Sequence, residues 1–195
     1  FTQYGKLLLL LVGTMLFMAF VINPIIIFIY LRCNPYPLVF RCLRESGLTA
    51  FFTRSSAANI PVNMAMCEKL GLDKDFYSVS IPLGATINMD GTAIYQCVAT
   101  IFLATCCGMT LTLGQMVTIV VTATLASIGT AGTPGAGMIM LAMVLEAMNI
   151  PVDMIMIIYG IDRLFDMGRT CLNITGDISC ACCVTKWESK KTAVK

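Results

Sequence analysis

The 195-residue chain is 57% hydrophobic and 12% charged, roughly half the ~25% charged share of an average soluble domain. This composition excludes an ordinary soluble domain, and several apolar stretches are long enough to cross a bilayer, so we predict a polytopic membrane protein. The net charge of +2 favours no partner, and no nucleic-acid binding is expected. The first apolar stretch is too long for a secretory signal. It follows Phe1 almost at once, so we expect the C-terminal part of a longer protein.

Five membrane segments are predicted within one all-α membrane domain over 1–195. They are a transmembrane helix at 6–31, a re-entrant hairpin at 38–70, a broken transmembrane helix at 75–107, a second re-entrant hairpin at 115–147 and a last transmembrane helix at 153–187. Pro24 predicts a kink in the first helix. Each hairpin arm is too short to cross alone, and its irregular tip needs cover from protein or water.

Small and polar residues interrupt three of these segments. The two hairpin tips are predicted at 53–61 and 127–137, and the broken helix is interrupted at 88–92. Thr53 precedes Asn88 by 35 residues, and Ser127 precedes Asp162 by the same 35 residues. We therefore predict two inverted repeats, each a hairpin followed by a broken helix, and paired interruptions of this kind indicate a transporter binding site near the midplane.

A polar stripe crosses the last helix. Its members are Asp162, Asp166, Arg169, Thr170, Asn173 and Asp177. At 100° per residue they fall within an arc of about 100° on one helix face. A charge at the bilayer centre costs at least ~2.5 kcal/mol, so the stripe must face protein, a cavity or an ion.

The basic residues predict the orientation of the chain. Those assigned to one side are Arg32, Arg41, Arg44, Lys69, Lys74, Lys186, Lys190, Lys191 and Lys195. The positive-inside rule then makes the first hairpin and the C-terminus cytoplasmic and the second hairpin extracytoplasmic. The hairpins enter from opposite faces, so both tips are expected to meet beside the polar stripe.

These residue types favour binding over catalysis. Small residues at the tips let backbone groups approach a ligand, half-helix N-termini favour a carboxylate, and unwound carbonyls suit Na⁺. The planar guanidinium group of Arg169 can donate two hydrogen bonds to a carboxylate, and Asp166 can bind an ammonium group. Asp90 and Asp177 suit hard cations. The chain has no histidine and no visible nucleophile–base pair, so no enzyme is predicted. The ten cysteines are read as apolar filler rather than as a zinc site or disulfides.

Several of these residues also allow a purely structural interpretation. Asp162, Asp166 and Arg169 could pair with one another to join helices, and 88–92 could be a simple kink. The glycine-rich second tip could be a helix-packing motif. Arg54 could form a salt bridge rather than contact a ligand.

Four motifs in order carry a resemblance to a known family. They are Thr53-Arg54-Ser55-Ser56, Asn88-Met89-Asp90-Gly91-Thr92, the glycine-rich tip 127–137, and Asp166-Met167-Gly168-Arg169-Thr170 with Asn173 and Asp177. Together they resemble the sodium-coupled glutamate/aspartate transporters of the dicarboxylate/amino acid:cation symporter group. The stretch 55–88 also resembles the bacterial sodium/serine–threonine branch, but Arg169 and Asp90 favour acidic amino acids, and Asp166 argues against dicarboxylates.

The resemblance implies a substrate site and Na⁺ sites. The substrate site would comprise Ser56, Thr92, Thr133, Gly137, Asp166, Arg169, Thr170 and Asn173. Arg169 would bind the side-chain carboxylate, Asp166 the α-amino group, and Ser56, Thr170 and Asn173 the α-carboxylate. One Na⁺ would be held by carbonyls of Gly84, Asn88 and Asn173 with the Asp177 carboxylate, a second by carbonyls of Thr86, Ser127, Ile128 and Thr130, and a third by Asp90 and Asn88 with ligands from upstream of this chain.

The resemblance also implies a mechanism. We expect sodium-coupled symport of aspartate or glutamate by an elevator-like motion of this unit, in a multi-pass plasma-membrane homotrimer held by an N-terminal scaffold. The alternatives are a sodium-coupled serine/threonine or dicarboxylate symporter, or an anion-conducting or structural membrane subunit.

Overall fold

The computed structural model describes residues 2–192, and it describes side chains for residues 4–189. Its elements are α1 (Thr2–Phe17), η1 (Met18–Ile22), α2 (Asn23–Leu31), α3 (Tyr36–Cys42), η2 (Leu43–Gly47), α4 (Leu48–Thr53), α5 (Ser56–Lys69), α6 (Lys74–Ile87), α7 (Asp90–Cys106), α8 (Leu113–Ile128), α9 (Ala136–Ala147), η3 (Val152–Ile155) and α10 (Met156–Thr192). The predicted all-α class is confirmed. Among the basic residues used for orientation, Lys195 and the side chains of Lys190 and Lys191 lie outside the described part.

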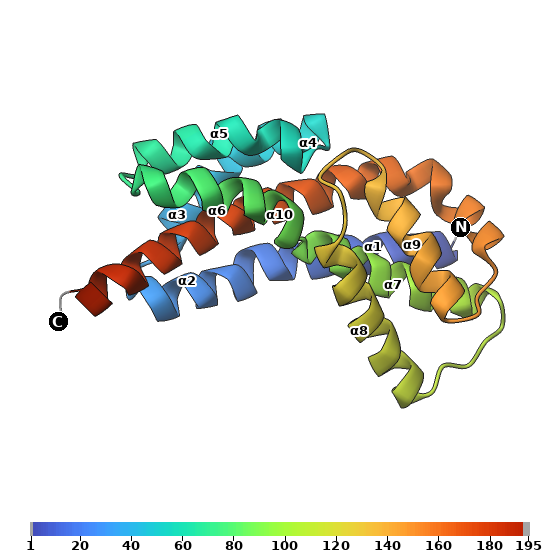
Figure 1. The fold of residues 1–195 in the computed structure, drawn as a ribbon. Coiled ribbons are helices and arrows are strands. Elements are labelled where there is room, and N and C mark those ends of the chain that lie inside the picture. Colours follow the sequence, from blue (N-terminus) through green and yellow to red (C-terminus); the bar gives the residue numbers. More distant parts are fainter. Residues whose placement is uncertain (1, 193–195) are drawn as a thin grey trace.

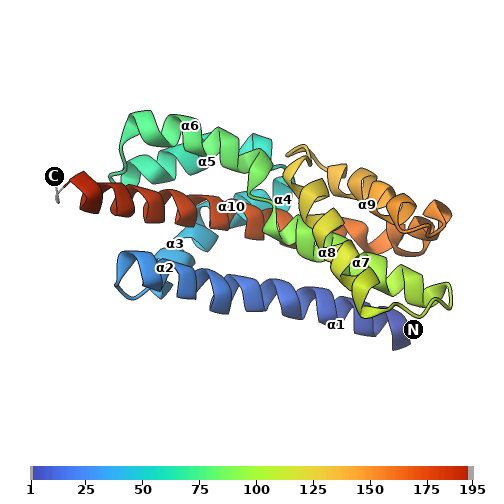
Figure 2. The same ribbon diagram turned by 60° about the horizontal axis from the view of Figure 1, so that its bottom comes forward.

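The long helix α10 is the axis of the fold. It contacts α1, α2, α4, α5, α6 and α7, so nearly every other element packs on it (Figure 1). The second view shows α1 and α2 along one side of α10 and the α5–α6 pair along the other (Figure 2). Because of this central position, most side chains around α10 face protein.

The first predicted helix is continuous but not uniform. Pro24 has no N–H to donate to the Phe20 carbonyl, and a π-helical turn, η1, ends two residues before it. The Tyr36 hydroxyl donates to the Phe20 carbonyl over 3.4 Å. The helix is therefore irregular just before Pro24, at this π-helical turn, while the predicted kink stays a prediction. Residues 4–31 form the one described helix that is long and apolar enough to cross a membrane by length and composition.

The first hairpin turns over two residues only. Arg54 adopts left-handed backbone, with φ 55°, and ends α4. Ser55 then caps α5, because its hydroxyl accepts a hydrogen bond from the Ala58 N–H over 3.1 Å. The predicted tip at 53–61 was too long, since α5 begins at Ser56 and tolerates Pro61 within it.

The predicted helix break is confirmed in the first repeat, between α6 and α7, and is absent from the second repeat, in α10. Asn88 and Met89 have non-helical backbone between α6 and α7, whereas Asp90 already belongs to α7. The corresponding helix of the second unit, α10, runs without interruption through 37 residues. The prediction of two broken helices was therefore wrong for α10, although Asn173 and Gly176 repeat the spacing of Asn88 and Gly91.

The tips of the two hairpins meet, as predicted. The loop between α8 and α9 arches over to the α4–α5 junction (Figure 1). There the Gly132 carbonyl accepts hydrogen bonds from the Ala57 N–H, over 3.0 Å, and from the Ser55 hydroxyl, over 2.8 Å. A Cβ at Gly132 would lie 3.0 Å from the Ala57 nitrogen, so a glycine is needed for this close approach.

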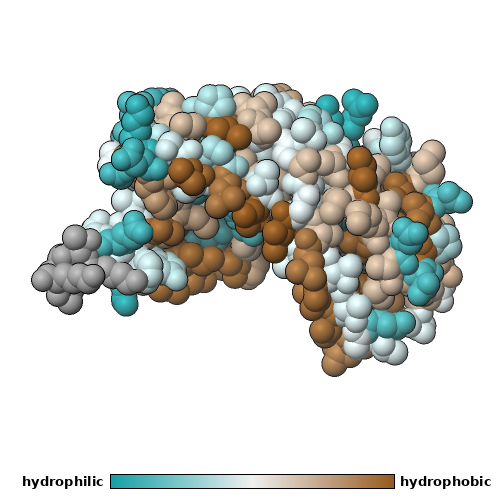
Figure 3. Space-filling view, viewed as in Figure 1, coloured by the Kyte–Doolittle hydropathy of each residue, from teal (hydrophilic) through white to brown (hydrophobic). Residues whose placement is uncertain are grey.

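Two apolar cores lie on either side of this meeting point. One gathers α1, α7, α9 and the first part of α10, and the other gathers α3, α5, α6 and the last part of α10. Outward-facing apolar residues gather along α8 and the α2 edge (Figure 3). Such an exterior, with a polar layer inside, agrees with the expected membrane setting.

Candidate functional site

One small cavity lies where the two tips, the helix break and α10 meet. Its lining contains all eight residues predicted for the substrate site, namely Ser56, Thr92, Thr133, Gly137, Asp166, Arg169, Thr170 and Asn173. Arg54, Met89, Thr130, Ala131 and Gly132 complete the lining. The cavity volume is about 10 Å³, which is close to the room that one water needs. The cavity is therefore too small, in this structure, to hold an amino acid.

Arg169 is enclosed by protein groups, with 2% of its surface exposed. Its Nε donates to Asp166 Oδ1 over 3.0 Å, and its Nη1 donates to Asp162 Oδ1 over 3.2 Å. The guanidinium carbon lies 4.3 Å from the centre of the Tyr95 ring. A Cβ at Gly137 would lie 2.8 Å from that carbon. The charge of Arg169 is thus balanced by two carboxylates. Its buried Nη2 lies 3.0 Å from Asp166 Oδ1 but makes no hydrogen bond with the described residues.

Asp166 connects α10 to both hairpins. Its Oδ2 accepts a hydrogen bond from the Gly135 N–H of the second tip over 3.2 Å. The same oxygen lies 3.9 Å from Nη1 of Arg54, on the first tip. For Arg54, this ion pair agrees with the salt-bridge reading. Asp166 and Arg54 also line a larger adjoining pocket of about 350 Å³, which includes Tyr159 and Arg163.

Asn173 holds the start of α7 against α10. Its Oδ1 accepts the Gly91 N–H over 2.7 Å, and its Nδ2 donates to the Thr92 hydroxyl over 3.1 Å. The Asn88 amide donates to the Asn173 carbonyl over 3.2 Å. A Cβ at Gly91 would lie 2.7 Å from the Arg169 carbonyl, so only glycine permits this contact. The helix break at Asn88 and Met89 is therefore hydrogen-bonded to the polar stripe of α10 and is not a simple kink.

The residues predicted for the first Na⁺ site lie together. Asp177 is 5% exposed, and none of the ion pairs among the described residues involves it. Its Oδ1 packs directly on Gly84, where a Cβ would lie only 1.7 Å away. A buried carboxylate without a cationic side chain is costly unless a cation binds it. Asn88 and Asn173 are joined by the hydrogen bond described above.

The residues predicted for the other two Na⁺ sites make fewer contacts with one another among the described residues. Of the second set, Ser127 and Thr130 are buried, whereas Thr86 and Ile128 are exposed. The Thr130 N–H donates to the Ser127 carbonyl over 3.0 Å. For the third set, Asn88 and Asp90 both lie within 4 Å of a Cβ built on Gly176, so their side chains share one small region.

Several buried polar residues near the stripe were not predicted. They are Tyr95, Gln96 and Thr100 on α7, with Ser46, Asn59 and Asn63 in the first hairpin. Their signal in the sequence is a helical spacing of three or four residues, shared by Thr92, Tyr95 and Gln96 and by Asn59 and Asn63. Asp162 was in the predicted stripe but outside the predicted substrate site, and the structure places it against Arg169.

Comparisons with known proteins add the family context. The model of the sodium:dicarboxylate symporter family matches residues 1–187. The chain is 51% identical to the serine/threonine transporter SstT of Bifidobacterium adolescentis, over 93% of this chain and 43% of that protein. It is 48% identical to the protein of the same name from Streptococcus agalactiae, over 90% of this chain and 45% of the relative, and 47% identical to the one from Campylobacter jejuni, over 90% and 44%. The chain thus spans less than half the length of these relatives.

Proposed function

Because the chain belongs to the sodium:dicarboxylate symporter family, we propose that it forms the substrate- and sodium-binding part of a symporter for small neutral amino acids such as serine and threonine. Membership of this family confirms the predicted resemblance and the expectation of a transporter family rather than an enzyme family. Acidic specificity, favoured by the sequence alone, gains no support from the relatives, which are named serine/threonine transporters.

The state of Arg169 is the observation that carries this choice of substrate. Arg169 already has two carboxylates beside it, Asp162 at 3.2 Å and Asp166 at 3.0 Å, so an acidic side chain would compete with them for the guanidinium group. A third carboxylate would meet Asp162 as a like charge in a buried site. A hydroxyl brings no charge, and its oxygen can accept a hydrogen bond from Nη2 of Arg169, which lies 3.0 Å from Asp166 Oδ1 but donates no hydrogen bond to the described residues.

The rest of the site suits the common part of an α-amino acid. We assign the α-ammonium to Asp166, whose carboxylate lies at the cavity wall between both tips. We assign the α-carboxylate to the hydroxyl and amide donors of Ser56, Thr170 and Asn173. Thr92, Thr133 and Gly137 then shape the space for a short side chain.

Sodium is proposed as the coupling ion. Asp177 supplies the buried negative charge, and carbonyls of Gly84, Asn88 and Asn173 supply neutral oxygens, the ligand type that hard cations prefer. Carbonyls of Thr86, Ser127, Ile128 and Thr130 form the second proposed set, and Asp90 with Asn88 the third. The second set includes the end of α8 beside the tip, so closing the tip would favour substrate and Na⁺ together.

We extend the proposal to the whole protein by family. The chain would be the moving unit of an elevator-like, multi-pass protein of the cell membrane. Its C-terminus would be cytoplasmic, and an N-terminal scaffold would hold a homotrimer.

Substrate competition tests the proposal. The native protein that carries this chain is reconstituted in liposomes, and uptake of labelled serine is measured in NaCl and in choline chloride. We expect Na⁺-dependent uptake that threonine inhibits at far lower concentrations than aspartate or succinate. Equal inhibition by aspartate would overturn the choice of a neutral substrate, and uptake without Na⁺ would overturn the coupling.

A further inference from the structure

A buried polar network joins the first hairpin to Asp177. Its members are Ser46 on η2 and Asn59 and Asn63 on α5, each with 0% of its surface exposed. Asparagine is rarely buried so completely without a specific role for its amide. The helix α5 also contributes to the second apolar core. None of the three network residues lines the substrate cavity, and no predicted site included them.

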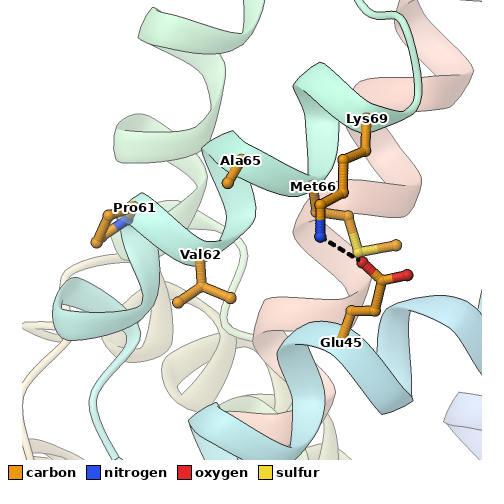
Figure 4. Close-up of a pocket in the computed structure, with 6 residues that line it drawn as sticks. All are labelled: Glu45, Pro61, Val62, Ala65, Met66 and Lys69. Carbon is orange, nitrogen blue, oxygen red and sulfur yellow. Dashed lines mark hydrogen bonds and ion pairs between the residues drawn. The ribbon is translucent and has the colours of Figure 1, made fainter.

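The network fixes the orientation of the Asn63 amide. Ser46 Oγ and Asn59 Nδ2 both donate to Asn63 Oδ1, the latter over 3.1 Å, and Asn59 Nδ2 also donates to Ser46 Oγ over 2.6 Å. Two donors at Oδ1 force the NH₂ group of Asn63 to face the other way. The same two elements are also joined by the ion pair between Lys69 on α5 and Glu45 on η2, 3.1 Å long (Figure 4).

The NH₂ group of Asn63 faces α10. It donates to the Ile174 carbonyl over 3.3 Å and to Asp177 Oδ2 over 3.5 Å. The other carboxylate oxygen of Asp177 packs on Gly84. Asn63 and Gly84 therefore hold the carboxylate from two sides, and of these two contacts only that of Asn63 is a hydrogen bond.

We propose that Asn63 is a positioning residue that orients the Asp177 carboxylate for Na⁺, with Ser46 and Asn59 fixing the amide of Asn63. The inference rests on the proposed role of Asp177 as a Na⁺ ligand. Partners outside the ligand set often fix the direction of a metal ligand, and their loss weakens metal binding without removing the site. Through this contact the first hairpin, and not only the second, affects Na⁺ affinity.

The test measures Na⁺ binding without any amino acid. The thermal unfolding midpoint of the native protein is recorded as NaCl replaces choline chloride at constant ionic strength, since a bound ion stabilises the folded state. We expect Asn63→Ala to raise the half-saturating Na⁺ concentration about tenfold, the loss typical of one charge-assisted hydrogen bond. Ser46→Ala, which removes one of two donors to Asn63, should raise it about threefold. Asn63→Ser serves if the alanine variant does not fold.

Met66→Ala is the matched control. Met66 lies one turn further along α5, is 1% exposed in the same core, and carries no polar group near Asp177. Its truncation should lower the unfolding midpoint at every Na⁺ concentration but keep the half-saturating value within about twofold. An equal shift in Met66→Ala and Asn63→Ala would overturn the inference, because packing alone would then explain it. A native protein that Na⁺ does not stabilise would overturn it as well.

Serine binding separates this inference from the proposed function. In saturating Na⁺, Asn63→Ala should bind labelled serine as the native protein does, because the variant lacks no substrate contact. If the native protein binds Na⁺ but no serine, the proposed substrate is wrong while the role of Asn63 stands. If serine binding by Asn63→Ala is lost even in saturating Na⁺, the positioning role is wrong.

Discussion

Asp162 Oδ1 lies 3.2 Å from Nη1 of Arg169, seven residues further along the same helix, and both side chains are buried. Together with Asp166 this contact leaves the Arg169 cluster with one carboxylate more than it has guanidinium groups, before Arg54 is counted at 3.9 Å from Asp166. An arginine beside a transport site is usually expected to attract an acidic substrate. In the proposed substrate site the neighbouring carboxylates change that expectation, because Arg169 is already paired with Asp162 and Asp166.

Asp162→Asn tests the influence of this pairing on specificity. The substitution keeps the shape but removes the charge that faces Nη1 of Arg169. We expect aspartate to compete against serine about tenfold better than it does in the native protein, as for a gain of ~1.4 kcal/mol. Competition binding in saturating Na⁺ measures the ratio. Asp153→Asn, an exposed carboxylate on η3, is the control, and an unchanged ratio in Asp162→Asn would contradict the argument.

Gly137→Ala tests the contact between the second hairpin and Arg169. The added Cβ would lie 2.8 Å from the guanidinium carbon, so Arg169 must leave its place between Asp162 and Asp166. We expect a loss of stability of about 1–3 kcal/mol, typical of overpacking, with weakened serine binding. Gly160→Ala on α10 meets no atom within 4 Å and should be neutral or slightly stabilising. Comparable thermal unfolding midpoints for the two variants would show that Gly137 has no packing role.

Gly84→Ala probes the proposed Na⁺ site from the side opposite Asn63. A Cβ there would overlap Asp177 Oδ1 at 1.7 Å, so the carboxylate must rotate away. We expect stabilisation by Na⁺ to fall at least about tenfold in apparent affinity, since the main charged ligand is displaced. Gly13→Ala on α1, where a Cβ meets nothing within 4 Å, should bind Na⁺ as the native protein does. Unchanged Na⁺ dependence in Gly84→Ala would remove Asp177 from the site.

The sequence predicted those parts of the site that polar side chains in apolar segments reveal. These parts are the stripe on α10, the break at Asn88 and the second tip. Charged residues and runs rich in glycine and proline are unfavourable in lipid, so their presence in apolar segments marks positions that must face protein or a ligand. The helix boundaries at the first tip were less predictable. Ser55 is one of several polar residues there, and only the structure shows that it caps α5 and that Pro61 lies inside the helix.

Partners across helices could not be predicted from one sequence. Arg169 and Asp162 are visible as neighbours on one helix face, but the ring of Tyr95 and the close approach of Gly137 come from other helices. Asn63 contacts Asp177 across 114 residues of chain, and nothing in the local pattern of α5 indicates this. The sequence therefore predicted the candidate Na⁺ ligands but not Asn63, the residue proposed to orient one of them.

Ser55→Ala tests whether the contact between the tips keeps the cavity closed. The hydroxyl donates to the Gly132 carbonyl over 2.8 Å and accepts from the Ala58 N–H over 3.1 Å, so its loss removes a cap and a contact between tips. Loss of such a cap costs about 0.5–2 kcal/mol. We expect faster amide hydrogen exchange over 129–135 in the variant, measured by mass spectrometry, because local opening of the second tip becomes easier.

Ser78→Ala, whose exposed hydroxyl bonds only within its own helix, is the control and should exchange like the native protein. If protection of 129–135 is unchanged in Ser55→Ala, the second tip is held by Asp166 and the Ala57 N–H rather than by this serine.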